Sequence, residues 1–240
     1  MIYSHFYWRI GFKSRLYDLL MPEVYLDSMR RIVEWVPTSP NAILLDAGCG
    51  SGLIIKYLKS IKFVGTYIGL DILLDALINT RKKAGLENIL DRVYLAQSDL
   101  TQSIPLSDKS VDTIIAHFSL YTIRPDKRSY ILKEFRRLLR RGGILVLVEP
   151  SPEYSAKRII KKSKRMISFD DGITKTWIKK WILYPLTYQF GLKFIERQLK
   201  NSVWRASSGK ELCDEMSLNG YKVKNVESVY ANSATLIILK

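Results

Sequence analysis

The chain has 240 residues, of which 47% are hydrophobic, and its net charge is +15. This size and composition predict one α/β domain with additions and exclude wholesale disorder, and no run approaches the roughly 20 apolar residues of a membrane-spanning helix. Two cysteines and two histidines are too few for a disulfide framework or a zinc cluster, so we expect no metal site and a cytoplasmic location.

The first 40 residues precede the first predicted strand and are rich in aromatic side chains. Apolar residues between Tyr25 and Val36 recur at helical spacing, and Pro37 follows them, so this segment predicts a helix. The aromatic residues further upstream are too many for a free tail. We expect residues 1–40 to form a helical lid over the binding edge of the sheet, with these upstream aromatics packed in it: Tyr3, Phe6, Tyr7, Trp8, Phe12 and Tyr17.

Residues 41–52, NAILLDAGCGSG, combine a short apolar strand, an acid at Asp46 and glycines at every second position from 48 to 52. Such glycines allow a tight turn and the close approach of a ligand to the backbone. Residues Ser51–Ser60 predict a helix whose first N–H groups face that turn. This arrangement is typical of the nucleotide-binding corner of a Rossmann-like sheet, although a purely structural turn is the alternative. A dinucleotide fingerprint would need its third glycine at Leu53, so we do not predict one.

A second acid, Asp71, ends the next predicted strand, Thr66–Leu70. A carboxylate about 20 residues after the glycines, at the tip of a strand, can accept two hydrogen bonds from a ribose diol. Asp71 could instead, or in addition, cap the predicted helix Leu73–Ala84, which we expect Gly85 to end.

Four further elements continue the alternation of strands and helices. Arg92–Ala96 predicts the third strand, and Val111–Ala116 predicts the fourth. A helix is predicted from Pro125 through Arg140, with apolar residues inward and a basic outer face that includes Arg128. We expect Gly142 and Gly143 to stop this helix before a buried fifth strand, Ile144–Val148. The alternation predicts a parallel sheet.

The alternation of strands and helices ends after Pro150. A basic run and a Trp/Tyr-rich stretch follow, in which Trp177 and Trp181 stand four residues apart, as do Tyr184 and Tyr188. We interpret residues 151–206 as a basic, aromatic, helical cap inserted in the fold, with a helix that Pro185 kinks or splits. The end of the chain predicts a capping box at residues 208–211, a helix closed by residues 219–220, and a hairpin of strands 221–230 and 234–239.

The order of these elements resembles the class I S-adenosylmethionine (SAM) methyltransferases, and more narrowly the type 11 branch with the ubiquinone and menaquinone biosynthesis enzymes. The resemblance is strong over residues 42–150, returns over residues 207–240, and is weak over residues 1–40 and 155–205. It implies a Rossmann-like, seven-stranded, mostly parallel sheet with a C-terminal antiparallel hairpin, in a three-layer α/β/α fold. The chain would then divide into a helical lid (1–40), a SAM-binding core (41–150), a cap (151–206) and a segment that completes the core (207–240). The motifs that carry it are LDAGCGSG (45–52), IGLDI (68–72), QSDL (97–100), LLRRGGILVLVEP (138–150) and SGKELCDEMSLNGY (208–221).

The resemblance also implies a cofactor, S-adenosyl-L-methionine, with S-adenosyl-L-homocysteine as its product, and roles for several residues. Asp46 would support the methionyl end of the cofactor, and Asp71 would hold the ribose hydroxyls. The backbone of Gly48, Cys49 and Gly50 would contact the ligand, and we assign no chemistry to the Cys49 thiol.

Asp99, after the third strand, would accept a hydrogen bond from the adenine amine, and Leu100 would pack on the ring. Ile72 and His117 complete the predicted cofactor pocket, His117 near the sulfonium. A general base is needed only if the acceptor must lose a proton, and His117 and Tyr121 are then the candidates by their position after the fourth strand. His117 could equally be a satisfied histidine of the pocket wall.

The uneven distribution of charge along the chain is the main indication of the methyl acceptor. Between residues 155 and 210 there are 14 lysines and arginines but only 3 acids, so this segment carries +11 of the net charge. One hypothesis is a small or lipid-like acceptor, such as a quinone precursor, reached at an anionic membrane surface. An RNA or DNA substrate is less favoured, since no recognisable nucleic-acid motif is present. A non-catalytic SAM-binding protein and a merely solubilising charge remain alternatives, and the sequence does not indicate the oligomeric state.

Overall fold

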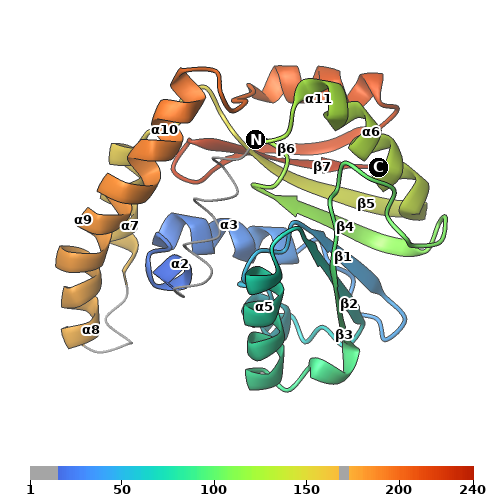
Figure 1. Ribbon diagram of the computed structural model, residues 1–240, viewed down its shortest axis with the longest axis horizontal. Coiled ribbons are helices and arrows are strands. Elements are labelled where there is room, and N and C mark those ends of the chain that lie inside the picture. Colours follow the sequence, from blue (N-terminus) through green and yellow to red (C-terminus); the bar gives the residue numbers. More distant parts are fainter. Residues whose placement is uncertain (1–15, 168–172) are drawn as a thin grey trace.

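The computed structural model describes residues 16–167 and 173–240, which form a seven-stranded sheet between two helix layers (Figure 1). The strand order is β3-β2-β1-β4-β5-β7-β6, in which β7 is antiparallel to both β5 and β6 and the other pairs are parallel. This confirms the predicted fold class and the C-terminal hairpin. The strands are β1 Ile43–Ala47, β2 Thr66–Asp71, β3 Val93–Gln97, β4 Val111–His117, β5 Leu139–Pro150, β6 Val223–Val229 and β7 Ala234–Leu239.

Each face of the sheet has its own apolar core, because successive residues of a strand point to opposite faces. Leu44 contributes to the core under α3 (Glu23–Val33), α4 (Ile55–Ser60) and α5 (Leu74–Leu86). Leu45 contributes to the core under α6 (Pro125–Leu138) and α11 (Gly209–Leu218). The central strands are therefore covered on both sides, which is why they read as continuous apolar runs in the sequence.

Several predicted helix boundaries were wrong. The helix expected over Tyr25–Val36 spans Glu23–Val33. The helix after the glycine turn begins at Ile55, not at Ser51, because Gly52 has a left-handed φ of +69° that an α-helix does not accept. The next helix continues through Gly85 to Leu86, and Asn88 takes the left-handed conformation instead. The α6 helix ends at Leu138 without a glycine stop, because Leu139 already pairs with β4 as the first residue of β5. The glycines expected to end it lie within β5.

The cap is an arm of helices beside the sheet (Figure 1). It begins with α7 (Ala156–Met166) and continues with an unbroken helical stretch over residues 173–200. Pro185 does not split this stretch, because the flanking turns are π-helical and their hydrogen bonds already depart from the α pattern. The stretch comprises α8 Ile173–Ile178, the π turn Lys179–Leu183, α9 Tyr184–Leu186, the π turn Thr187–Leu192 and α10 Lys193–Lys200.

The arm packs against the N-terminal segment, which contains α2 (Leu16–Leu19) and α3. The backbone N–H of Glu23 donates to the Tyr184 hydroxyl (3.3 Å), and Thr187 Oγ1 donates to the Leu20 carbonyl (2.8 Å). Lys179 also forms an ion pair with Glu23. The residues just before the sheet are thus held by a segment more than 150 positions further along the chain.

The expected capping box at the start of α11 is present, with Ser208 and Glu211 satisfying each other's backbone N–H groups. Ser207 N–H donates to the Pro150 carbonyl (2.9 Å), so the two ends of the cap meet at the edge of the core. The remaining short element is a 3₁₀ turn at Leu90–Arg92. Among the described helices, none has the length and apolar character that crossing a bilayer requires.

Candidate active site

The glycine turn lies at the carboxyl ends of β1 and β2. Gly48, Gly50 and Gly52 all have positive φ, between +54° and +83°, which residues with a side chain rarely adopt. The N–H groups of Gly48 and Cys49 both donate to the Leu70 carbonyl, at 2.8 and 2.9 Å. A Cβ atom on Gly48 would approach the Cβ of Ser119 to 2.5 Å. The turn is therefore fixed tightly between β2 and the loop that leaves β4, with no room for a side chain.

Asp71 connects the glycine turn to the start of α5. Its Oδ2 accepts from Gly50 N–H (2.8 Å) and its Oδ1 accepts from Leu73 N–H (2.9 Å). The cap role considered from the sequence was wrong: the N-cap position of α5 is Leu73, without a side-chain cap hydrogen bond, and Asp71 holds the Leu73 N–H just before the helix. A carboxylate can accept several hydrogen bonds at once, so these two backbone contacts do not by themselves exclude hydrogen bonds to a ribose diol. The other role, binding of a ribose diol by Asp71, stays a prediction.

Asp46 is buried at the end of β1, where its Oδ2 accepts from the Tyr67 hydroxyl (2.7 Å). Burial raises the pKa of Asp46 from its ordinary value of 3.8 to about 7, the Tyr67 hydrogen bond lowers it in part, and the charge of Asp71 raises it further. The carboxyl group consequently exchanges its proton near neutral pH. The second acid predicted from the sequence, Asp71, is therefore close enough to raise the pKa of Asp46.

Asp46→Asn should therefore make unfolding less dependent on pH. In the wild type the folded state keeps a proton that the unfolded state loses between pH 3.8 and about 7, so stability falls as the pH rises through this window. Asparagine cannot ionise, and its oxygen still accepts from Tyr67. The wild type should lose on the order of 2 kcal/mol of unfolding free energy from pH 5 to pH 8, and the variant should not show this loss. Urea denaturation at the two pH values measures this, and an equal difference at both would contradict it.

The other predicted cofactor residues surround the turn less closely. Asp99 Oδ1 accepts from the N–H and the hydroxyl of Thr101 (both 2.8 Å), so one oxygen of this carboxylate stabilises the turn after β3. Leu100 is buried in the core under α6, and Ile72 is 38% exposed just after β2. Cys49 is buried with its Sγ 4.0 Å from Thr80 Oγ1, and burial raises the pKa of the thiol. This agrees with assigning it no chemistry.

His117 ends β4 and lies under α3. Ser28 Oγ donates to the Tyr25 carbonyl (2.7 Å), so Ser28 accepts from His117 Nε2–H, 2.9 Å away. Nδ1 then carries a bare lone pair, and it has no hydrogen-bond partner among the described residues. Burial lowers the pKa of His117 to about 3, so the ring is neutral at physiological pH. The ring contacts those of Tyr25 and Phe118, at centroid distances of 4.7 and 4.8 Å.

Tyr121, the other candidate base, lines a cavity that the sequence did not predict. The cavity has a volume of about 460 Å³ and lies between the loop after β4 and the end of the cap. Tyr121 packs edge to face on Trp204 (5.3 Å between centroids), and its carbonyl accepts from Arg205 N–H (3.0 Å). Trp204 and Arg205 carry no motif in the sequence, and only the adjacent capping box marks their place. The wall includes three aromatic and three cationic side chains: Tyr121, Arg124, Tyr154, Lys200, Trp204 and Arg205.

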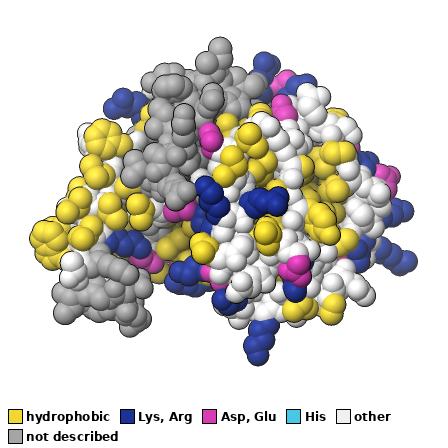
Figure 2. All heavy atoms as spheres, turned by 60° about the horizontal axis from the view of Figure 1, so that its bottom comes forward, with side chains coloured by type: hydrophobic (Ala, Val, Ile, Leu, Met, Phe, Trp, Pro, Cys, Tyr) yellow, Lys and Arg dark blue, Asp and Glu magenta, His cyan; other side chains and the backbone are white. Residues whose placement is uncertain are grey.

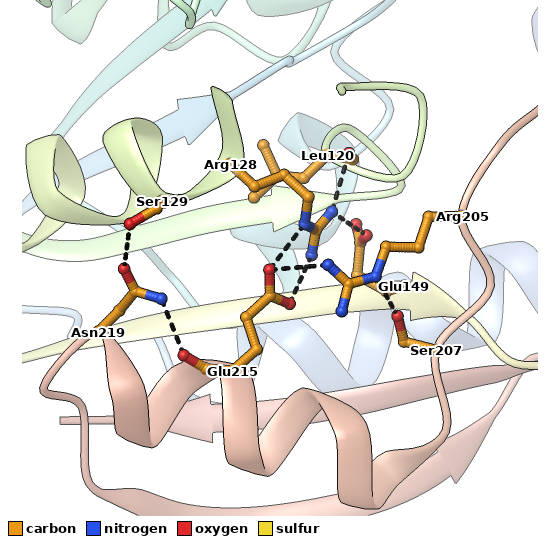
Figure 3. A network of polar contacts seen from close by, with 8 residues as sticks. All are labelled: Leu120, Arg128, Ser129, Glu149, Arg205, Ser207, Glu215 and Asn219. Atoms are coloured by element: carbon orange, nitrogen blue, oxygen red, sulfur yellow. Dashed lines mark hydrogen bonds and ion pairs between the residues drawn. The ribbon is translucent and has the colours of Figure 1, made fainter. Parts of the chain in front are cut away.

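A buried ionic network holds the loop that carries Tyr121 (Figure 3). Arg128 of α6 pairs with Glu149 at the end of β5 (2.9 Å) and with Glu215 of α11 (3.0 Å), and it donates to the Leu120 carbonyl (2.9 Å). Arg205 joins through Glu215 (2.9 Å). The sequence placed Arg128 on the basic outer face of α6, which was wrong: its side chain is 1% exposed. Two carboxylates from distant parts of the chain offset the cost of burying it.

The N-terminal segment reaches the glycine turn through Asp18, whose carboxylate accepts from the Ser51 hydroxyl and from the Lys83 ammonium group of α5. The lid itself stays a prediction, because Tyr3, Phe6, Tyr7, Trp8 and Phe12 lie outside the described residues and the side chain of Tyr17 is not described.

The structure therefore brings the glycine turn, Asp46 and Asp71 together at one edge, with His117 at the neighbouring strand end and Tyr121 beyond it. Comparison with known families adds the decisive observation: residues 45–147 match the family described as a methyltransferase domain. The chain carries a class I SAM-dependent methyltransferase domain. SAM is the cofactor of this methyltransferase domain, as the resemblance predicted.

Known proteins similar to this methyltransferase are distant in sequence. The carboxy-S-adenosyl-L-methionine synthase of Campylobacter fetus is 26% identical over 84% of this chain and 79% of its own length. The demethylmenaquinone methyltransferase of Staphylococcus saprophyticus is 27% identical over 59% of this chain and 58% of its own. A SAM-dependent methyltransferase structure from Aquifex aeolicus has a TM-score of 0.61 and 17% identity, covering 95% of this chain and 97% of that one. The last similarity shows the shared fold.

Proposed function

We propose that this methyltransferase transfers the methyl group to a small or lipid-like acceptor that combines an aromatic ring with an acidic group, as a quinone precursor does. The observation that supports this most is the cavity beside Tyr121, whose volume of about 460 Å³ suits a single small molecule. Its wall offers aromatic faces and three cations, Arg124, Lys200 and Arg205, against one acid, Glu196. The similarity to a demethylmenaquinone methyltransferase points in the same direction.

On the cofactor side, we propose that Asp71 accepts hydrogen bonds from the ribose hydroxyls and that Asp46 supports the methionyl end. The backbone of residues 48–50 would lie against the ligand. Asp99 would accept from the adenine amine with the acceptor positions that Thr101 leaves unused. Ile72 and Leu100 would supply apolar contacts to the ring.

When bound, SAM supplies a methyl group already activated by its sulfonium, so the protein's task is to orient the acceptor and to exclude water. The network around Arg128 fixes the loop with Tyr121, and the aromatic rings of Phe118, Tyr121 and Trp204 pack edge to face at the end of β4. If the acceptor must lose a proton, the candidate base is His117, whose Nδ1 has no hydrogen-bond partner among the described residues; its pKa of about 3 makes it a weak base, so it would need to lie directly against the acceptor.

His117→Ala should accordingly lower kcat by about 10²-fold or more and leave the affinity for SAM nearly unchanged. The wild-type rate should show no inflection near pH 6.5 from this group, because its pKa is lowered to about 3. Ser28→Ala serves as the matched variant, since it removes the partner of Nε2 but leaves Nδ1 in place. Steady-state kinetics from pH 5 to 9 and calorimetric SAM titration measure both effects. Equal losses of turnover and cofactor affinity in His117→Ala would make it a residue of the cofactor pocket instead.

The proposed acceptor class is tested with the full chain, methyl-labelled SAM and a cell extract separated into lipids, nucleic acids, proteins and small molecules. Label in an acidic aromatic small molecule or lipid, with release of S-adenosylhomocysteine, is the expected result. Label in RNA or DNA would support the nucleic-acid alternative, and SAM binding with no label anywhere would support a non-catalytic role. A carboxylated form of SAM as product would align this chain with its Campylobacter relative and contradict the proposal.

A further inference from the structure

The long helical stretch of the cap exposes a line of large apolar side chains, which we name the aromatic stripe. Each of its members is between 40% and 68% exposed, and they recur at intervals that place them along one side of the stretch. Figure 2 shows hydrophobic side chains gathered at the left of the molecule, where the arm lies. The stripe consists of Trp177, Ile178, Trp181, Ile182, Leu186 and Phe190.

The opposite side of the same stretch is fully occupied by the protein. Tyr184 and Thr187 are buried and hydrogen-bonded to Glu23 and Leu20, at and just before the start of α3, and Leu192 belongs to the core. The stripe therefore points away from the fold, and repacking it inward would break these contacts. Exposed apolar patches of this extent are rare on monomeric proteins and mark a surface that is covered in use.

Cations border the stripe closely. The ammonium groups of Lys164 and Lys180 lie 5.2 and 5.8 Å from the ring centre of Trp181, and that of Lys193 lies 4.9 Å from the ring centre of Tyr188. On α7, Lys161, Lys162 and Arg165 are exposed as well. Within the described part of the arm, residues 156–167 and 173–200, the single acid is Glu196, and it pairs with Lys200 (3.4 Å). The partner must then be both apolar and anionic.

We propose that the arm docks on an anionic lipid bilayer, lying in its interface with the aromatic stripe among the headgroups and upper acyl chains. Tryptophan and lysine are the residues that favour this layer, the first by its amphipathic ring and the second by its reach and charge. A nucleic acid would match the charge, but the aliphatic half of the stripe, Ile178, Ile182 and Leu186, would gain nothing from phosphate. This inference goes beyond the proposed function and does not depend on the identity of the acceptor.

Flotation of the full chain with vesicles at physiological salt tests the docking. Vesicles of phosphatidylcholine with phosphatidylserine should carry the protein upward, and phosphatidylcholine alone should do so much less. Trp181→Ser combined with Phe190→Ser should weaken binding to the anionic vesicles roughly tenfold or more. Lys161→Glu combined with Lys162→Glu should weaken it similarly and lower its salt dependence. Leu218→Ser, at an 89% exposed position on α11, is the matched control and should bind like the wild type.

Unchanged thermal melting would establish that the variants are folded. Three results would overturn the docking proposal: no flotation with anionic vesicles, equal flotation of the stripe variant and the control, or a dimer of this chain that the stripe variant abolishes. The separate labelling experiment decides the acceptor, since transfer to a soluble acceptor requires no vesicle. A failure of docking and a failure of the proposed function are thereby distinguishable.

Discussion

Arg128→Met is expected to lower the free energy of unfolding by about 3–5 kcal/mol, the largest stability effect we predict for a single substitution. Methionine fills a similar volume but leaves Glu149, whose side chain is 2% exposed, without the cation that balances it. It also removes the donor to the Leu120 carbonyl, so the loop with Tyr121 loses an anchor. Urea denaturation at pH 7, followed by far-UV circular dichroism, measures the change.

Lys133→Met is the matched control, because Lys133 is exposed on the same helix. It should change stability by less than about 0.5 kcal/mol. Adding Glu149→Gln to Arg128→Met removes the unbalanced charge and should recover part of the loss. If the arginine and lysine variants were equally stable, the network would have no role in holding the fold.

Asp71→Ala is expected to weaken SAM binding about 10²-fold or more, because two charge-assisted hydrogen bonds to the ribose would be lost. The same substitution leaves the N–H groups of Gly50 and Leu73 without their acceptor and should loosen the glycine turn. Isothermal titration with SAM and with S-adenosylhomocysteine measures the binding loss, which should be similar for both ligands since they share the ribose.

Two further variants separate the ribose contact from the integrity of the turn. Asp71→Asn keeps an oxygen acceptor for the turn but lacks the charge, and it should bind with intermediate affinity. Asp75→Ala removes the acid in the first turn of α5 and should bind like the wild type. Binding of SAM to Asp71→Ala as tightly as to the parent would remove the basis for the proposed cofactor site.

The features that local sequence determines were predicted correctly. The strands around the glycine turn, the capping box at Ser208 and the C-terminal hairpin each depend on neighbouring residues, so their patterns are complete within a short window. Asp46 and Asp71 were placed correctly at strand ends for the same reason. Their ligand-binding roles stay predictions.

The features that depend on distant residues were not predicted. Arg128 looks like an exposed cation on its helix, and its burial follows from Glu149 and Glu215, the second of which lies 87 positions away. The cavity joins the loop after β4 with the last part of the cap, and neither segment shows a motif for it. The late start of α4 was missed for a different, local reason: it depends on the left-handed φ of Gly52, a conformation that glycine permits but does not require.

The single hydrogen bond between Ser207 N–H and the Pro150 carbonyl means that the chain leaves the core for the cap and returns at nearly the same point. A short linker could therefore bridge β5 to α11 directly, at a small entropic cost of loop closure. The contacts of the arm with Leu20 and Glu23 would be lost, so the N-terminal helices would need new cover. If those helices were covered in another way, the cap would be an exchangeable module. Grafting a different insertion between these two residues would change the surface that the enzyme presents to acceptors and leave the cofactor-binding edge of the sheet unchanged.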